Sequence, residues 1–125
     1  MDLSLERPEG YLFVRSVGAR GIVLIDRELT HSFLLAPDRA IEDWLVDDAG
    51  MLGADHVDTL LALKPELVIL GTGGKQVFPA AAFMAGFLRK GIGIEVMDNA
   101  AAARTYNLLA GEGRRVVAGF ILPRA

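Results

Sequence analysis

The chain has 125 residues, of which 52% are hydrophobic, and carries a formal net charge of −3 at pH 7. This length suits one buried core and is too short for two ordinary domains, so we expect a single domain over residues 1–125. An acidic chain without clustered Lys and Arg is not expected to bind nucleic acid. The absence of cysteine excludes disulfides, thiolate catalysis, zinc fingers and iron–sulfur clusters.

The amino terminus, MDLSLERPEG, lacks a basic start followed by an apolar run. This pattern predicts neither a signal peptide nor a transit peptide. The apolar runs elsewhere in the chain are too short to span a bilayer. The sequence therefore indicates a cytoplasmic protein with no membrane span.

The amino-terminal part of the chain favours antiparallel strands. Residues 10–17 and 21–26 are rich in aromatic and β-branched side chains and are separated by turn glycines, a pattern typical of a β-hairpin. A third strand is expected over residues 29–35, stopped by Pro37.

The segment 41–50 is ambiguous. Ile41, Trp44 and Leu45 recur at helical spacing, and Trp44 suits a place in the core. The acidic side chains of this segment lack the spacing of a calcium loop, so we interpret them as solvated surface; they are Glu42, Asp43, Asp47 and Asp48.

From Ala54 onward the pattern alternates between helices and strands. The expected order is a helix over 54–64, a strand over 67–71, a helix over 79–90, a strand over 92–98, a helix from Asp98 or Asn99 to about Leu109, and a strand over 114–122. The runs at 67–70 and 94–97 are continuously apolar, which predicts two central parallel strands covered on both faces. The sequence thus predicts an antiparallel section followed by a layered α/β arrangement.

A glycine-rich stretch, LGTGGKQVFP at residues 70–79, follows the first of these parallel strands. The carboxyl ends of parallel strands meet at one sheet edge, where α/β proteins usually bind ligands, and the free N–H groups at the start of the next helix favour anions. The stretch is not a Walker A loop, because only two residues separate Gly71 from Gly74 and Gln76 follows Lys75. A sharp turn between strand and helix explains the glycines equally well.

The candidate ligand-binding residues are those that this edge would bring together, with one arginine from the next helix: Gly71, Thr72, Gly73, Gly74, Lys75, Asp98, Asn99 and Arg104. In a small-molecule binder or enzyme, Lys75 would clamp an anion and Asp98 would be the nearby acid or base. Arg104 could reach these loops or serve the structure alone.

The rest of the sequence shows no catalytic constellation. His31 and His56 have no HExxH or acidic partner pattern, and no serine lies in a nucleophile elbow. We therefore expect no metal and no cofactor, and the sequence leans away from an enzyme.

The combination of GTGGKQVFP and GIGIEVMDNAAAARTYNLLAGEGRRVVAGF is distinctive. It resembles the small domain family of unassigned function that includes mitochondrial respiratory complex I assembly factor three and the adipogenesis-associated Mth-type domain protein. The resemblance implies a three-layer α/β domain with a mixed central sheet, and a non-enzymatic protein-binding or assembly-assisting role, with respiratory complexes as the family precedent. A protein partner is thus the first expectation, and a small anion bound at 71–75 is the alternative. Without a visible mitochondrial leader, the chain resembles a free-standing prokaryotic member.

Overall fold

The computed structural model describes residues 10–123, so the predictions made for the amino-terminal segment 1–9 lie outside the described residues. The helices are η2 (Ala49–Met51, a 3-10 turn), α2 (Ala54–Leu61), α3 (Ala81–Leu88) and α4 (Asn99–Gly111). The strands are β1 (Val14–Val17), β2 (Ile22–Leu24), β3 (Glu28–Leu29), β4 (Phe33–Ala36), β5 (Arg39–Ile41), β6 (Leu67–Gly71), β7 (Gly93–Met97) and β8 (Val116–Phe120).

Two sheets organise the chain. The larger sheet has the strand order β5-β4-β8-β6-β7, and the smaller one has the order β1-β2-β3. In the larger sheet β6 is parallel to both β7 and β8, whereas β4 is antiparallel to β5 and β8. The predicted mixed central sheet and the antiparallel amino-terminal section are both confirmed.

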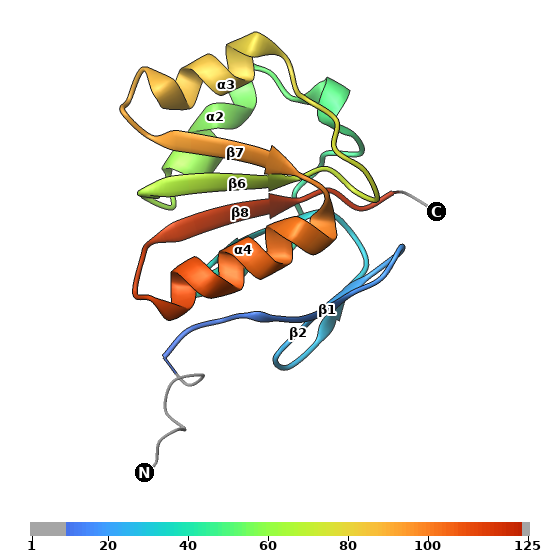
Figure 1. The fold of residues 1–125 in the computed structure, drawn as a ribbon. Helices are drawn as coiled ribbons and strands as arrows, with labels where there is room; N and C mark the ends of the chain where they lie inside the picture. The colour runs from blue at the N-terminus through green and yellow to red at the C-terminus, as the bar shows by residue number, and fades with distance from the viewer. Residues whose placement is uncertain (1–9, 124–125) are drawn as a thin grey trace.

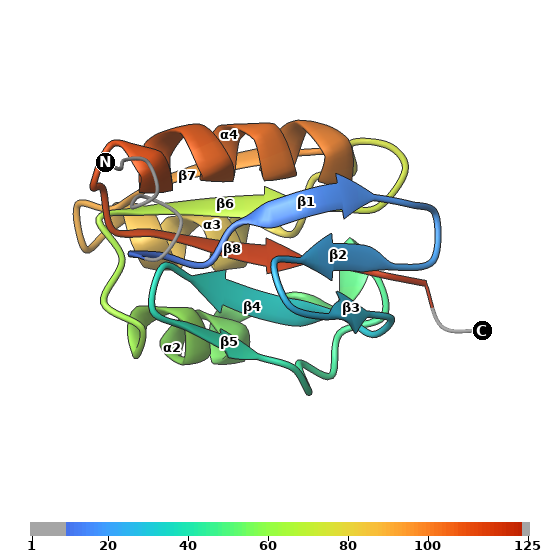
Figure 2. The same ribbon diagram turned by 90° about the horizontal axis from the view of Figure 1, so that it is seen from below.

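The domain has three layers, with one hydrophobic core on each side of the larger sheet. In Figures 1 and 2, α2 and α3 cover one face of the larger sheet, and α4 lies with the small sheet on the other face. Strand β6 supplies side chains to both cores, because Val68 and Leu70 pack toward α2 and α3 while Ile69 packs toward α4. This double burial explains why residues 67–70 read as a continuous apolar run.

Strand β7 differs from its prediction because it lies at the edge of the larger sheet. Gly93 and Glu95 are exposed, while Val96 is buried against the α2 and α3 side. Its parallel pairing with β6 was predicted correctly. An edge strand needs only one neighbour, so its sequence tolerates a charged residue that β6 does not contain.

The third predicted strand, 29–35, is wrong as one element. It is divided between β3 in the small sheet and β4 in the larger one. At the break, the buried Ser32 hydroxyl donates to Val46 O at 2.6 Å and accepts from Leu122 N at 2.9 Å. These two long-range bonds favour a change of sheet at Ser32, which no local pattern reveals.

The segment 42–48 contains neither helix nor strand, so its helical spacing was misleading. Trp44 and Val46 are buried while Leu45 between them is exposed. The helix expected from Pro79 also begins later, at Ala81, because Ala80 has extended backbone angles and acts as the N-cap.

Side chains of α4 fasten the small sheet to the rest of the molecule. Asn107 accepts from Val14 N at 2.9 Å and donates to Val14 O at 2.8 Å, so its amide pairs with β1 as a neighbouring strand would. Tyr106 donates to Leu12 O at 2.8 Å, and burial raises the pKa of its phenol, which therefore stays a donor. The Tyr-Asn part of the distinctive motif thus has a structural role.

Val68→Asp tests the central position of β6. Val68 is fully buried. An unpaired carboxylate there should lower the free energy of unfolding by at least about 3 kcal/mol. Urea denaturation followed by circular dichroism measures the change, with Leu108→Asp on the exposed face of α4 as a control expected within about 0.5 kcal/mol of wild type. Equal stability of the two variants would contradict the assignment of β6 to the core.

Candidate functional site

Three strands end at the same edge of the larger sheet. Gly71 of β6 is in register with Met97 of β7 and with Phe120 of β8. The residues that follow, 72–75, 98–99 and 121, therefore lie close together, as the sequence predicted for the first two segments.

Asn99 joins all three chain segments at this edge. Its side-chain Oδ1 accepts from Gly73 N at 3.1 Å, and its Nδ2 donates to Ile121 O at 2.9 Å. Its own backbone N–H donates to Gly73 O at 2.8 Å. Asn99 is buried, and both polar atoms of its amide are used to close the edge.

The three glycines of the loop differ in why the fold needs glycine at their positions. A Cβ on Gly71 would clash with Asn99 Oδ1, so the close approach of Asn99 requires glycine there. Gly73 has a φ of 98°, a conformation that side chains disfavour. Gly74 has open space where a Cβ would lie, and the fold itself gives no reason for glycine at this position.

Side-chain hydrogen bonds of Thr72 and Gln76 hold the loop in its conformation. The Thr72 hydroxyl donates to Lys75 O at 2.6 Å and accepts from Val77 N at 3.0 Å. The Gln76 side chain donates to Val96 O on the edge strand at 2.8 Å. In a phosphate cradle such groups would point outward to bind the ligand. Here some of them already form hydrogen bonds within the turn.

The charge arrangement does not match the anion cradle expected from the sequence. Residues 76–80, which have no regular secondary structure, separate the loop from α3, so the amino end of α3 does not open directly into it. The helix that begins at this edge is α4, and its Ala101 N–H already donates to Asp98 Oδ1 at 2.8 Å. The Asp98 carboxylate therefore occupies the position that an anion would use.

Of the two cations named from the sequence, one lies in the loop and the other lies apart from it. Lys75 and Arg104 are both exposed. Lys75 belongs to the loop, whereas Arg104 lies on α4 and lines neither of the hollows that border the loop. The structure thus brings together seven of the eight predicted residues and leaves Arg104 outside.

Two surface hollows border the loop, and Gly73 and Gly74 line both. The hairpin-side hollow, of about 210 Å³, is lined by Val17, Gly18, Ala19, Gly73, Gly74, Asp98, Asn99 and Ala100. The lysine-side hollow, of about 320 Å³, is lined by Ala19, Asp47, Asp48, Ala49, Thr72, Gly73, Gly74, Lys75, Val77, Ile121 and Pro123.

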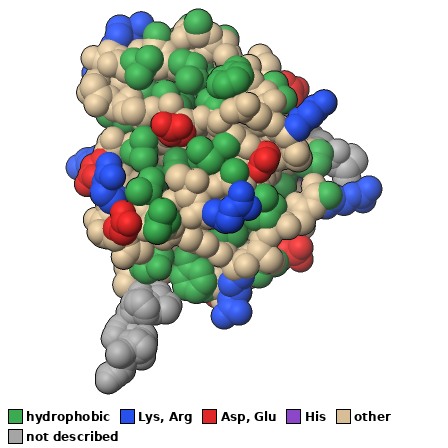
Figure 3. Space-filling model, in the orientation of Figure 1, with side chains coloured by type: hydrophobic (Ala, Val, Ile, Leu, Met, Phe, Trp, Pro, Cys, Tyr) green, Lys and Arg blue, Asp and Glu red, His purple; other side chains and the backbone are tan. Residues whose placement is uncertain are grey.

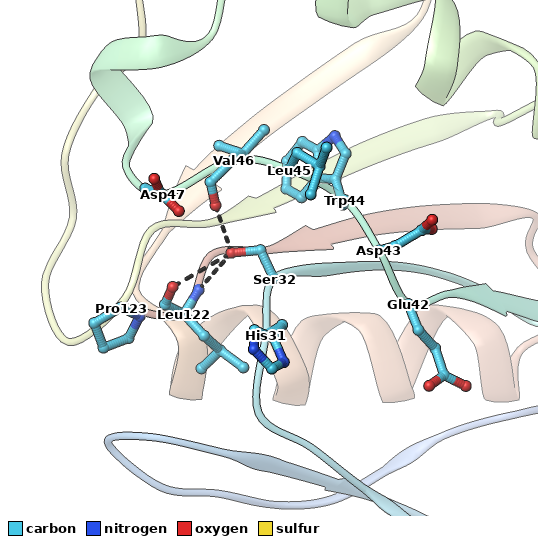
Figure 4. A pocket seen from close by; sticks show the side chains of 10 residues that line it. All are labelled: His31, Ser32, Glu42, Asp43, Trp44, Leu45, Val46, Asp47, Leu122 and Pro123. Carbon is cyan, nitrogen blue, oxygen red and sulfur yellow. Dashed lines mark hydrogen bonds between the residues drawn. The ribbon is translucent and has the colours of Figure 1, made fainter. Parts of the chain in front are cut away.

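A third hollow was missed by the sequence reasoning. This tryptophan hollow, of about 200 Å³, is lined by His31, Ser32, Glu42, Asp43, Trp44, Leu45, Val46, Asp47, Leu122 and Pro123 (Figure 4). It exists because Ser32 holds Val46 and Leu122, the second residue after β8, close together. No signal in the sequence indicated it, because Trp44, Leu45 and Val46 are all apolar and differ only in their burial.

The histidines and acidic residues form no metal centre in the described part of the chain: no group of three or more His, Asp or Glu is placed to hold an ion. His56 lies in the first turn of α2, where its Nδ1 accepts from Gly53 N at 3.1 Å. Across residues 10–123, no helix combines the length and the apolar character needed to cross a membrane.

Residues 14–121 match the model of a family described as a protein of unknown function, DUF498/DUF598. The chain belongs to this family. The match covers most of the chain, and the resemblance predicted from the sequence is confirmed.

Curated relatives carry two kinds of name. A "13 kDa major membrane protein" of Francisella tularensis is 29% identical over 93% of this chain and 95% of its own length. The human NADH dehydrogenase [ubiquinone] 1 alpha subcomplex assembly factor 3 is 26% identical over 90% of this chain, which spans 61% of that factor's length. Because the Francisella relative is named a membrane protein, cytoplasmic location stays a prediction for this chain.

Solved structures share the fold. A Xanthomonas campestris protein studied by NMR is 44% identical, with a TM-score of 0.83 over 98% of this chain and 92% of that one. A Mth938-like domain from Bordetella pertussis is 27% identical, with a TM-score of 0.80 over 97% of this chain and 92% of that one.

Alanine substitutions at Gly71 and at Gly74 test whether the fold needs glycine at the first position but not at the second. Gly71→Ala should lower the free energy of unfolding by about 1–3 kcal/mol, because the new Cβ displaces Asn99 from its bonds. Gly74→Ala should change it by less than about 0.5 kcal/mol. Thermal and urea unfolding of both variants measure the difference. A destabilisation by Gly74→Ala as large as that by Gly71→Ala would show that the fold needs both glycines.

Proposed function

We propose that this domain acts by binding another protein and assisting its assembly, without catalysing a reaction. The observation that carries this proposal is the exposure of large apolar side chains: Leu45, which lines the tryptophan hollow, is 78% exposed, and Phe78 is 66% exposed. Val77, which lines the lysine-side hollow, and Met51 are exposed as well. Large apolar side chains exposed beside surface hollows are typical of protein-binding surfaces.

Two further observations support a protein partner. The human relative is named an assembly factor, although this chain spans only part of it. A second apolar area lies over α3, where Leu88 is exposed and where hydrophobic side chains gather at the top of Figure 3. Respiratory-complex assembly is the form of this role that the relative's name suggests.

The pair most suggestive of hydrolysis, His31 and Ser32, does not favour an enzyme. Both line the tryptophan hollow. The Ser32 hydroxyl, however, already bonds to Val46 O and Leu122 N, so it holds two chain segments together. A nucleophile needs its proton accepted by a base, whereas this proton is directed to a backbone carbonyl.

Affinity capture tests the protein-binding proposal. The tagged chain is expressed at its native level in its own cell and crosslinked, and the captured proteins are quantified by mass spectrometry against a tag-only control. We expect at least one protein to be enriched in proportion to the bait. No enrichment, together with turnover of a small molecule by the purified chain, would contradict the proposal.

A second candidate, a small-molecule or anion site at residues 71–75, is favoured by one observation. Gly74 lines both hollows beside the loop, and the fold does not explain its missing side chain. Glycine permits close approach of a ligand to the backbone, and Lys75 would then supply the complementary positive charge.

Lys75→Ala tests this second candidate. Wild type is screened by thermal shift against inorganic phosphate, nucleotides, phosphorylated metabolites and carboxylates. If the loop binds an anion, a ligand should raise the melting temperature saturably, and Lys75→Ala should weaken its binding by about 1 kcal/mol or more at an unchanged melting temperature of the free protein. If no compound stabilises the protein, or if the variant binds as tightly as wild type, the loop serves only as a turn.

A further inference from the structure

Helix α3 has no polar face. Its buried residues are Phe83, Gly86 and Phe87. The residues on its other side are exposed or half-buried, and all of them are apolar: Ala81, Ala82, Met84, Ala85 and Leu88. A surface helix normally carries charged or polar residues on its outer face, and a helix that is apolar all round is normally covered. The outer face of α3 therefore has the character of a surface that a partner covers.

The other two α-helices have the polar residues that α3 lacks. The exposed residues of α2 include Asp55, Asp58 and Thr59, and those of α4 include Arg104. Among the α-helices that the structure describes, α3 is the one without an exposed polar side chain. The apolar outer face is thus specific to α3 and is not a general property of this small domain.

Basic side chains follow directly after α3. Arg89 and Lys90 are both exposed, and neither forms an ion pair within residues 10–123, whereas Arg27, Arg114 and Arg115 do. Figure 3 shows basic side chains at the upper left, beside the hydrophobic side chains that cover α3. Residues 67–94 contain three basic residues and no Asp or Glu, in a chain whose formal net charge is −3. The carboxyl end of α3 is therefore a positively charged place on an acidic protein.

Acidic residues on the elements beside α3 leave these two cations unpaired. Asp58 on α2 and Glu95 on β7 are exposed, and neither forms an ion pair with Arg89 or Lys90 in the described part of the chain. Residues 94 and 96 pack toward α2 and α3, so the side chain of Glu95 between them points to the other face of the sheet. Arg89 and Lys90 are thus available to carboxylates of another molecule.

The middle of the outer face consists of small side chains. Alanines occupy positions 81, 82 and 85, while the larger Phe78 and Leu88 lie at the two ends and are 66% and 60% exposed. The distance between two packed helices depends on the side chains at their contact, so the alanines let another helix lie close to α3. Insertion into lipid gains mainly from large apolar side chains, which the middle of this face lacks.

A second copy of this chain fits the surface less well than a different protein does. Two copies related by a two-fold axis use the same patch on both sides of the interface. This patch contains Arg89 and Lys90 but no acidic residue to meet them. The unpaired cations therefore favour a partner that supplies the carboxylates itself.

From this shape and charge, and resting on the proposed protein-binding function, we infer that the α3 patch, residues 78, 81, 82, 85 and 88–90, binds an acidic amphipathic helix of the partner protein. The apolar stripe of that helix lies over the alanines between Phe78 and Leu88, and its Asp or Glu side chains lie against Arg89 and Lys90. The buried apolar side chains supply affinity, while the charge pairs fix the direction of the bound helix.

A photoreactive side chain maps this contact. Leu88 of the tagged chain is replaced by benzoylphenylalanine in its own cell, with the similarly exposed Leu108 of α4 replaced in a control. Crosslinked peptides are identified by mass spectrometry after capture. We expect position 88, but not position 108, to crosslink a segment of another protein that has apolar residues at helical spacing and several Asp or Glu. Crosslinks from position 88 only to lipid, only to a second copy of this chain, or only to segments without acidic residues would overturn the inference.

Variants measure the two parts of the contact. Leu88→Ser should lower the binding of the crosslinked partner about tenfold, and the double change Arg89→Ala with Lys90→Ala should lower it at least about threefold. The matched controls are Leu108→Ser on α4 and Arg15→Ala on β1, both at exposed positions, and they should leave binding unchanged. All variants are first checked for wild-type melting temperatures. Binding that the α3 variants leave unaltered would overturn the assignment to this patch.

The same variants separate this inference from the proposed function. If wild type captures a partner and the α3 variants capture it equally well, the inference fails while the protein-binding function stands. If wild type captures no partner, the proposed function fails, and the inference fails with it. Loss of the crosslinked partner in the α3 variants but not in the two controls supports both.

Discussion

The hydrogen bonds of Asn99 are the constraint on which the carboxyl edge of the sheet depends. One buried amide holds Gly73 after β6 and Ile121 after β8, and it does so from the first residue of α4 after β7. Parallel strands leave their carboxyl ends without a common connection, so loops at this edge are often mobile. Here a single side chain satisfies both an N–H and a carbonyl that burial would otherwise leave unpaired.

Other features of the edge follow from that amide. Gly71 must lack a side chain because Asn99 Oδ1 lies where its Cβ would be. Asp98 caps α4 and thereby fixes the direction in which Asn99 enters the sheet edge. The glycine-rich loop is consequently held in place by several hydrogen bonds.

Much of the fold was predictable because its signals are local. The continuous apolar run at 67–70 reports burial on two faces, and the Asp98 side chain with the polar-to-apolar pattern after it reports the start of α4. The divided strand at Ser32 and the irregular segment around Trp44 were not predictable, since the first depends on bonds of Ser32 to Val46 and Leu122 and the second on the bond between Val46 and Ser32. Helical spacing of Trp44 and Leu45 arose by coincidence in a segment without regular secondary structure.

The candidate site shows the same division. Sequence reasoning brought residues 71–75 to one edge with Asp98 and Asn99, because strand topology alone does so. It interpreted Asn99 as a ligand-binding residue, since nothing local shows that its amide is used for the carbonyl of Ile121. The tryptophan hollow was invisible for a related reason: its walls come from three chain segments that only the folded structure unites.

Asn99→Ala tests the central claim most directly. The variant leaves the Gly73 N–H and the Ile121 carbonyl without their partner, so the free energy of unfolding should fall by about 2–4 kcal/mol. Native-state hydrogen exchange, measured by NMR, should show loss of protection at the Gly73 amide. The Val14 amide, which donates to Asn107, serves as the control: its protection should fall by no more than the loss of global stability explains. If the stability stays within about 0.5 kcal/mol of wild type and the Gly73 amide is still protected, the account is contradicted and a ligand-binding role of Asn99 is favoured.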